Sequence, residues 1–507
     1  MNTAQQRKKY QRQHKQSQMP AAPMRRPGAV DVTSAKAVAS VAIGQGHPLI
    51  NDRENQRLYR YEHQVKSAFD QIVPVLKKIS ALQHETDFVG QAQRLASQEL
   101  GFELPEDILQ DAWVEQLDMR RLFAWCVFQT YRVFNEDFFS SDPLAGQQSQ
   151  DFNTFLQSCG FHSMDITPCA DGRLAHVIRY VLRLPQRDVR RKSFAGAMFD
   201  IDDNLQKWAE VEMLRFREGK PNRADDATRY LKVVAYHYSS VDPHHEGCAA
   251  HGSDTAKAAA AGLDKLNAFR QAVENTYCCG ASIDLLLIGI DTDTDSMRIH
   301  VPDQDGVIHL ERFVDTLDVY KVTQYGSASE GREFIANQVR SSSPEVMSGM
   351  LKLCSQLIEN NLSQIEYVRR FFGNAYPDTG HAERFIGAGV GFEEIQLRNL
   401  MYFAYLNTVE EATADLDVGI KIFTGLNVSH GLPVPVVVRF DYHGQVPGAR
   451  ERAVERCQRI SDALTQRYAA LNEKGLLHIM QVIRDCRADA GLEVLHCTVN
   501  ATEGGMH

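Results

Sequence analysis

The sequence predicts a multidomain protein of the α+β and α/β classes, in which a helical unit precedes two units built on sheets. A chain of 507 residues is too long for one hydrophobic core. Apolar side chains recur at helical spacing between about residues 52 and 145, and β-rich runs alternate with helical ones after residue 151. We expect four segments: a disordered basic arm at 1–50, a helical domain at 51–148, a first α/β domain at 149–394 and a second at 395–507.

The N-terminal arm is rich in Gln, Lys, Arg and Pro, so ordering it would cost more entropy than burial returns. Its first thirty residues hold no acidic side chain, but they hold these basic ones: Arg7, Lys8, Lys9, Arg12, Lys15, Arg25 and Arg26. The whole chain has a net charge of −10, which argues against nucleic acid as a general partner. The arm is therefore either a solvated tail or a docking segment for an acidic protein surface.

The chain has neither a membrane-spanning apolar run of about 20 residues nor the apolar region of a secretory signal. We expect a protein of the cytosol, or of a compartment filled from it, with no membrane partner. The ten cysteines are spread along the chain without a dense framework. In a reducing compartment, clustered Cys and His residues indicate metal binding or catalysis rather than disulfides.

The helical domain is predicted from two apolar stripes, the first being Val65, Phe69, Ile72, Val73, Leu76 and Ile79, and the second Leu117, Leu122, Phe123, Cys126, Val127 and Val133. The first α/β domain is expected to contain strands at His176–Leu184, Tyr230–Tyr238 and Ile283–Ile290.

The second α/β domain is expected to begin with a helix at Glu393–Leu406. Strands should follow at Val418–Phe423 and Pro435–Phe440, then a helix with Val454, Cys457, Ile460 and Leu464 on one face, and strands at Leu477–Ile483 and Leu492–Val499. This alternation is similar to that of the first α/β domain. It includes no matching Cys/His cluster, so a diverged copy would have lost its metal.

The residues with the clearest chemistry form a C-x-D-x-R pattern, Cys169, Asp171 and Arg173. Further along, the strand at Tyr230–Tyr238 runs into His237, and the loop after it contains Cys248. Two thiolates and an imidazole are ligands that zinc prefers, and three protein ligands leave the fourth tetrahedral position for water.

Four segments carry a family resemblance: PCADGRL at 168–174, DPHHEGCAAHGS at 242–253, CCGASIDLLLIGIDTDTD at 278–295 and GHAERFIGAGVGFEEIQLRNL at 380–400. They resemble the carboxysomal shell-associated carbonic anhydrases, a divergent branch of the β-class carbonic anhydrases. The resemblance extends over nearly the whole chain. It implies that 149–394 is a catalytic domain with a β-carbonic-anhydrase-like fold and that 395–507 is a related domain without zinc.

The resemblance also implies one Zn²⁺ per chain, held by Cys169, His237 and Cys248, with Asp171 and Arg173 as the catalytic dyad. Ordinary β-class enzymes place the histidine three residues before the second cysteine, which is the position of His245. We favour His237 because it lies at a strand end and the carboxysomal branch has an insertion between these ligands. His245 stays open as the alternative.

The expected activity is interconversion of CO₂ and bicarbonate in the carboxysome, supplying CO₂ to Rubisco. The resemblance suggests a homodimer or a higher homo-oligomer, with the arm contacting Rubisco or the shell. Regulation by a phosphorylated sugar is conceivable, although the chain has no phosphate-binding loop. The competing interpretations are another Cys₂His zinc lyase or hydrolase, and a structural zinc scaffold completed by a fourth Cys.

Overall fold

The computed structural model describes residues 46–500 with short gaps. The gaps are residues 113–114, 145–148, 186–189, 224–225, 278–280, 379, 393–395, 407–408 and 488–489. Nearly all of the basic arm expected at 1–50 lies outside the described residues.

The helical unit consists of α2 (Asp52–Asp70), α3 (Ile72–Ala81), α4 (Phe88–Glu99), α5 (Glu106–Asp111) and α6 (Met119–Ser141). Two of its helices begin at side-chain caps, since Asn51 accepts from the amide of Arg53 and Asp118 from the amide of Arg121. The expectation of a helical region here is confirmed.

The first sheet has six strands in the order β2-β1-β3-β4-β5-β6. They are β1 (Ser163–Pro168), β2 (Arg190–Arg191), β3 (Tyr230–Tyr238), β4 (Ile283–Asp291), β5 (Met297–His300) and β6 (Val314–Asp315). Strands β2, β1, β3 and β4 are parallel, and β5 and β6 are antiparallel. The helices of this unit are α7 (Ser149–Ser158), α8 (Ile201–Arg217), α9 (Thr255–Tyr277), α10 (Thr316–Thr323), α11 (Ala328–Ser342) and α12 (Ser348–Phe372).

The second sheet has five strands in the order β11-β10-β9-β7-β8. They are β7 (Phe385–Val390), β8 (Met401–Tyr405), β9 (Val434–Tyr442), β10 (Leu477–Asp485) and β11 (Glu493–Cys497), with helices α13 (Val409–Leu426), α14 (Ala449–Arg467) and the short α15 (Ala469–Asn472). All its pairs are parallel except β10 with β11. Strand β7 pairs within this sheet although it precedes residue 395, where we expected the C-terminal unit to begin.

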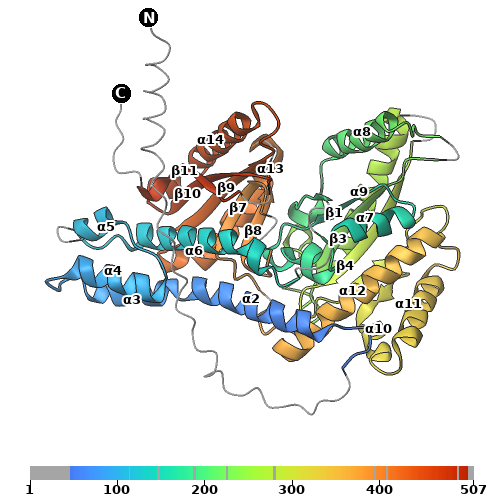
Figure 1. Cartoon of the computed structure of the whole chain (residues 1–507), viewed down its shortest axis with the longest axis horizontal. Coiled ribbons are helices and arrows are strands. Elements are labelled where there is room, and N and C mark those ends of the chain that lie inside the picture. The colour runs from blue at the N-terminus through green and yellow to red at the C-terminus, as the bar shows by residue number, and fades with distance from the viewer. Residues whose placement is uncertain are drawn as a thin grey trace, which may run out of the picture.

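Figure 1 shows the helical unit beneath the second sheet, with the first sheet on the other side of the molecule. Val65 and Phe69 of α2 share a hydrophobic core with Phe385, Val437 and Met480 of the second sheet. The opposite face of that sheet packs against α13 and α14. The helical unit and the C-terminal unit are therefore stabilised by one another.

Three expected elements are wrong, and two of them share one reason. The run at His176–Leu184 forms a π-helical turn, η3 (Val177–Val181), and Met401–Tyr405 is the strand β8 rather than the end of a helix. Both runs are almost entirely buried, so their apolar residues carry no period that separates helix from strand.

The strand expected at Val418–Phe423 lies within the helix α13. Its buried residues Leu416, Ile420 and Phe423 recur at intervals of four and three, which is the period of a helix face. The β-branched residues between them suggested a strand, but packing against the second sheet decides the conformation.

A buried ion pair joins the neighbouring parallel strands β1 and β3. Lys232 of β3 lies 3.0 Å from Asp165 of β1, and both side chains are at most 1% exposed. The Lys232 ammonium also donates to Thr167 and Asn204.

We expect Lys232→Met to destabilise the folded chain by about 3–5 kcal/mol, because it leaves the Asp165 carboxylate buried without its cation. The matched control is Arg94→Met, which breaks an exposed pair with Asp87 and should cost no more than about 1 kcal/mol. Urea unfolding of both variants measures the difference. Equal effects would contradict the assignment of Lys232 to a stabilising pair.

Candidate metal centre

The sequence-predicted ligands come from three segments that end at one edge of the first sheet. Cys169 directly follows β1, and His237 is the penultimate residue of β3. Cys248 follows the β3 loop and precedes the short 3₁₀ turn η5 (Ala249–His251). Because β1 and β3 are parallel, their carboxyl ends meet at the same edge, which is where open α/β sheets bind ligands.

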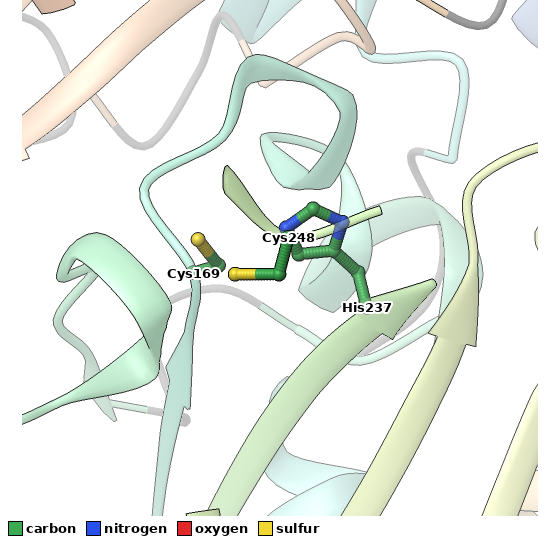
Figure 2. Close-up of side chains that lie close together, drawn as sticks. All are labelled: Cys169, His237 and Cys248. Carbon is green, nitrogen blue, oxygen red and sulfur yellow. The ribbon is translucent and has the colours of Figure 1, made fainter. Parts of the chain in front are cut away.

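The structure brings Cys169, His237 and Cys248 together (Figure 2), with one ligand atom of each within 4.8 Å of the others. All three residues are buried. Neither ring nitrogen of His237 has a hydrogen-bond partner in the described structure. A buried imidazole without a partner is costly, whereas a metal ion would use that nitrogen. The residues present therefore fit a metal of zinc type.

The two thiols are close enough to share a proton. A hydrogen bond between them lowers the pKa of Cys248 and, together with burial, raises the pKa of Cys169 well above its ordinary value. Coordinating cysteines are deprotonated, so a divalent cation would replace that proton and be neutralised by two thiolates.

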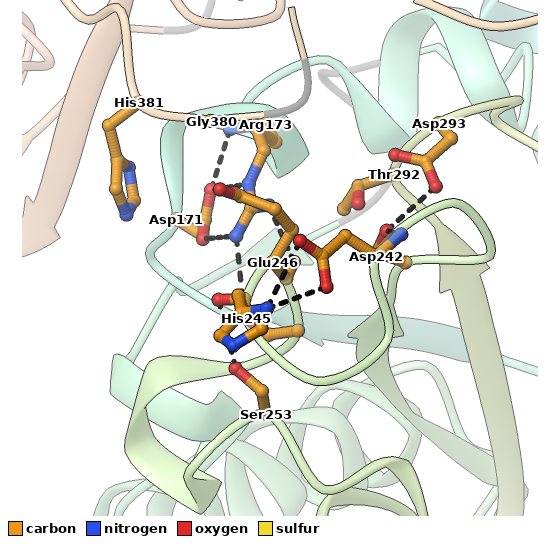
Figure 3. A network of polar contacts seen from close by, with 12 residues as sticks. Asp171, Arg173, Asp242, His245, Glu246, Ser253, Thr292, Asp293, Gly380 and His381 are labelled. Carbon is orange, nitrogen blue, oxygen red and sulfur yellow. Dashed lines mark hydrogen bonds and ion pairs between the residues drawn. The ribbon is translucent and has the colours of Figure 1, made fainter.

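Asp171 and Arg173 form a bidentate ion pair beside the ligand group (Figure 3). The Arg173 guanidinium donates to Asp171 Oδ1 at 3.0 Å from Nε and to Oδ2 at 2.7 Å. Burial opposes ionisation of this carboxyl, but Arg173 and the nearby His237 hold the pKa of Asp171 well below its ordinary value. His237 Nε2 lies 3.7 Å from Asp171 Oδ2. Asp171 is therefore an ionised acceptor at the edge of the ligand group.

Arg173 has a second set of contacts on the loop that carries Cys248. Its NH1 donates to the Glu246 carbonyl oxygen at 2.6 Å and lies 3.3 Å from the Glu246 carboxylate. The guanidinium is thus fixed from both sides, which limits the positions that Asp171 can take.

His381 and Glu383 lie beside the dyad, and sequence reasoning missed them as site residues. His381 Nδ1 donates to Glu383 Oε1 at 3.0 Å, and a His381 nitrogen and carboxylate oxygens of Asp171 and Glu383 lie within 4.8 Å of one another. Burial alone would lower the pKa of His381, but Glu383 and Asp171 raise it to about 9. The signal available was the GHAERF segment, which lies some two hundred residues from the dyad in the chain.

The alternative ligand His245 does not join the group. Its side chain is 79% exposed and lies 2.9 Å from Asp242. His251 lies closer to the site, with Nε2 3.5 Å from the carbonyl oxygen of Gly196. His237 is therefore the histidine that the fold places with the two cysteines.

Fold and site together define an α/β protein whose Cys₂His group, suited to a metal ion, lies beside an Asp–Arg pair at the carboxyl edge of a parallel sheet. Family models described as Carboxysome Shell Carbonic Anhydrase match the chain in three parts. The N-terminal model matches residues 47–139, the catalytic-domain model 151–381 and the C-terminal model 382–499.

Similar proteins carry the same description. The carboxysome shell carbonic anhydrase of Prochlorococcus marinus (strain MIT 9313) is 54% identical over 475 residues, which is 92% of each chain. That of Parasynechococcus marenigrum (strain WH8102) is 54% identical over 89% of this chain and 79% of the relative. That of Halothiobacillus neapolitanus is 45% identical over 85% of this chain and 86% of the relative. The chain belongs to the carboxysome shell carbonic anhydrase family.

We expect Glu383→Gln to lower the pKa of His381 from about 9 toward its ordinary value of 6.5, because it removes the charge that favours the imidazolium. Since folding raises this pKa, the stabilisation is complete below about pH 6.5 and is lost as pH rises through about 9. The variant should therefore lose most stability at about pH 6 and little at about pH 10. An NMR titration of His381 and thermal unfolding at both pH values measure this. Asp242→Asn is the control, and an equal effect from it would contradict the assignment.

Proposed function

We propose that this chain interconverts CO₂ and bicarbonate, the activity for which its relatives are named, using one Zn²⁺ held by Cys169, His237 and Cys248. The observation that carries the proposal is the buried His237 ring, which has no hydrogen-bond partner and faces two cysteine sulfurs. When bound there, zinc supplies a Lewis acid that activates water for attack on CO₂.

The dyad prepares this reaction. Ionised Asp171 cannot donate, so it accepts a hydrogen bond and fixes the orientation of the attacking group. Arg173 keeps Asp171 ionised and, by gripping both of its oxygens, holds it away from the ligand group. Without that grip, Asp171 could take the fourth coordination position and block the reaction.

Each hydration of CO₂ also releases a proton. His381 has a side chain that is 29% exposed and lies beside Asp171, with Glu383 as its buried partner. We assign His381 and Glu383 to proton exchange between the site and solvent, because an imidazole can take and release protons at accessible pH.

The competing interpretation as a structural zinc scaffold would require a fourth ligand. Among the described cysteines, no other joins Cys169 and Cys248 in the ligand group, and Cys278 and Cys279 lie outside the described residues. The observations therefore favour a catalytic site with an open position.

The second sheet is proposed to be a diverged copy of the first that has no zinc. Its strands β8, β7, β9, β10 and β11 repeat the order and direction of β2, β1, β3, β4 and β5. By strand register, it has Val390 and Asp441 at the positions of Cys169 and His237. Arg439 pairs with Asp441 at 2.7 Å, so a salt bridge fills the place of the ligand group.

The name of the relatives also supports a carboxysomal location, where the product CO₂ would serve Rubisco. In the proposed assembly the chain is a homodimer or a higher homo-oligomer, and the basic arm at residues 1–50 contacts Rubisco or the shell. Regulation by a phosphorylated sugar stays a proposal. Within the described residues, no helix combines the length and apolar content needed to cross a bilayer.

We expect Cys248→Ala to abolish both metal binding and CO₂ hydration, because an imidazole and a single thiolate hold zinc poorly. His245→Ala, three residues earlier in the same loop, should leave both unchanged. Metal content by atomic emission and stopped-flow CO₂ hydration measure the two properties. Loss of the metal in His245→Ala would show that the free imidazole of His237 is not the ligand.

We expect Arg173→Ala to reduce CO₂ hydration at least about 100-fold while the metal content stays near one per chain, because Asp171 loses its orientation but the three ligands remain. Arg173→Lys should also be impaired, since an ammonium cannot grip both carboxylate oxygens. If the metal were lost with the guanidinium, Arg173 would have a structural role instead.

A further inference from the structure

A short turn lies against both thiolate-bearing segments of the candidate metal centre. This 3₁₀ turn, η4 (Ala195–Ala197), follows Phe194, which pairs with Cys169 as an isolated parallel bridge. The amide of Gly196 donates to Cys169 Sγ at 3.2 Å. The turn therefore supplies a hydrogen bond to one of the proposed ligand sulfurs.

The conformation of this turn requires glycine. Gly196 has φ +64, and a Cβ there would lie 2.9 Å from His251 Nε2. The turn is thus confined between Cys169 on one side and the η5 segment after Cys248 on the other. Small shifts of its peptides would change the direction of the amide that faces Cys169.

A side chain of the second α/β unit, Asp415, forms a hydrogen bond with the turn. Asp415 of α13 is 6% exposed, and its Oδ1 accepts from the amide of Ala195 at 2.7 Å. Its own helix is anchored to β8, because the Tyr402 hydroxyl donates to the Asp415 carbonyl oxygen at 2.8 Å. Adjacent amides of one turn thus link a carboxylate of the second unit to a sulfur of the first.

We propose that Asp415 is a positioning residue that acts through the Ala195–Gly196 peptides to direct the Gly196 amide at Cys169 Sγ. An amide that donates to a thiolate reduces the charge the sulfur gives to a metal, so the metal stays a stronger Lewis acid. This inference rests on the proposed function of the centre. Under this inference, the C-terminal unit influences the metal centre proposed for the first α/β unit.

The carboxylate is suited to this role. Burial raises the pKa of Asp415 to about 6, although the bond from Ala195 opposes that shift, so the group is charged above that pH. A charged acceptor binds an amide more strongly than a neutral one.

The same helix offers a matched control. Asp417, two residues further along α13, pairs with Arg467 at the surface, where both side chains are more than 40% exposed. Replacing Asp417 removes a carboxylate from α13 without touching the turn.

The test uses the full chain loaded with Co²⁺, whose sulfur-to-metal absorption band reports the charge on the thiolates. Asp415→Leu removes the acceptor at similar size, Asp415→Asn keeps an acceptor oxygen, and Asp417→Leu is the control. We expect Asp415→Leu to move the band to longer wavelength, because the sulfur then gives more charge to the metal. CO₂ hydration by its zinc form should need higher pH. Asp417→Leu should resemble the unmodified chain, and Asp415→Asn, which keeps a weaker neutral acceptor, should lie between it and Asp415→Leu.

The outcomes separate this inference from the proposed function. If the unmodified chain bound no Co²⁺ through sulfur, the proposed metal centre itself would fail. If it bound Co²⁺ normally and Asp415→Leu left both the band and the pH dependence of CO₂ hydration unchanged, the positioning role would be overturned while the centre stood. Asp415→Ala replaces the Leu variant if that one does not fold. Failure of both to fold would assign Asp415 to stability and also overturn the proposal.

Discussion

The convergence of two parallel strand ends is the constraint on which the rest of this structure depends. Strands β1 and β3 are neighbours in register, so Cys169 and His237 must meet at one edge, and the loop after β3 has to return only far enough to add Cys248. Burying an imidazole without a hydrogen-bond partner there is unfavourable unless a metal ion uses its nitrogen. The buried Lys232–Asp165 pair joins the same two strands nearer their amino ends.

Much of this site could be predicted from the sequence, because its chemistry is local in the chain. The C-x-D-x-R pattern places Cys169, Asp171 and Arg173 within five residues, and a strand of continuous apolar residues runs into His237. The strands β3, β4, β9 and β10 were predicted for the same reason, since β-branched and apolar runs bounded by polar loops indicate buried strands. Three elements were predicted wrongly where burial on all sides removes the period, or where β-branched residues lie on a helix.

What the sequence could not predict is pairing across long separations. His381 and Glu383 lie near Asp171 because the segment between α12 and β7 passes beside the dyad, and no local pattern encodes that path. The same holds for Asp415, whose partner Ala195 is 220 residues away in the chain. In both cases a residue of ordinary type gains its significance from packing between units.

The two sheets also show how one topology can carry opposite electrostatic solutions. At the carboxyl edge of the first sheet, a bidentate Arg173–Asp171 pair lies beside the thiols. At the carboxyl edge of the second sheet, a bidentate Arg439–Asp441 pair lies on the end of β9. A guanidinium and a carboxylate that neutralise each other leave no net charge to attract a cation. Asp441 stands at the same position of β9 as His237 does of β3, so under the proposed relation between the sheets an internal salt bridge replaces the imidazole. The second unit nevertheless contacts the first near its site, because Asp415 of α13 accepts a hydrogen bond from the amide of Ala195 in the turn η4.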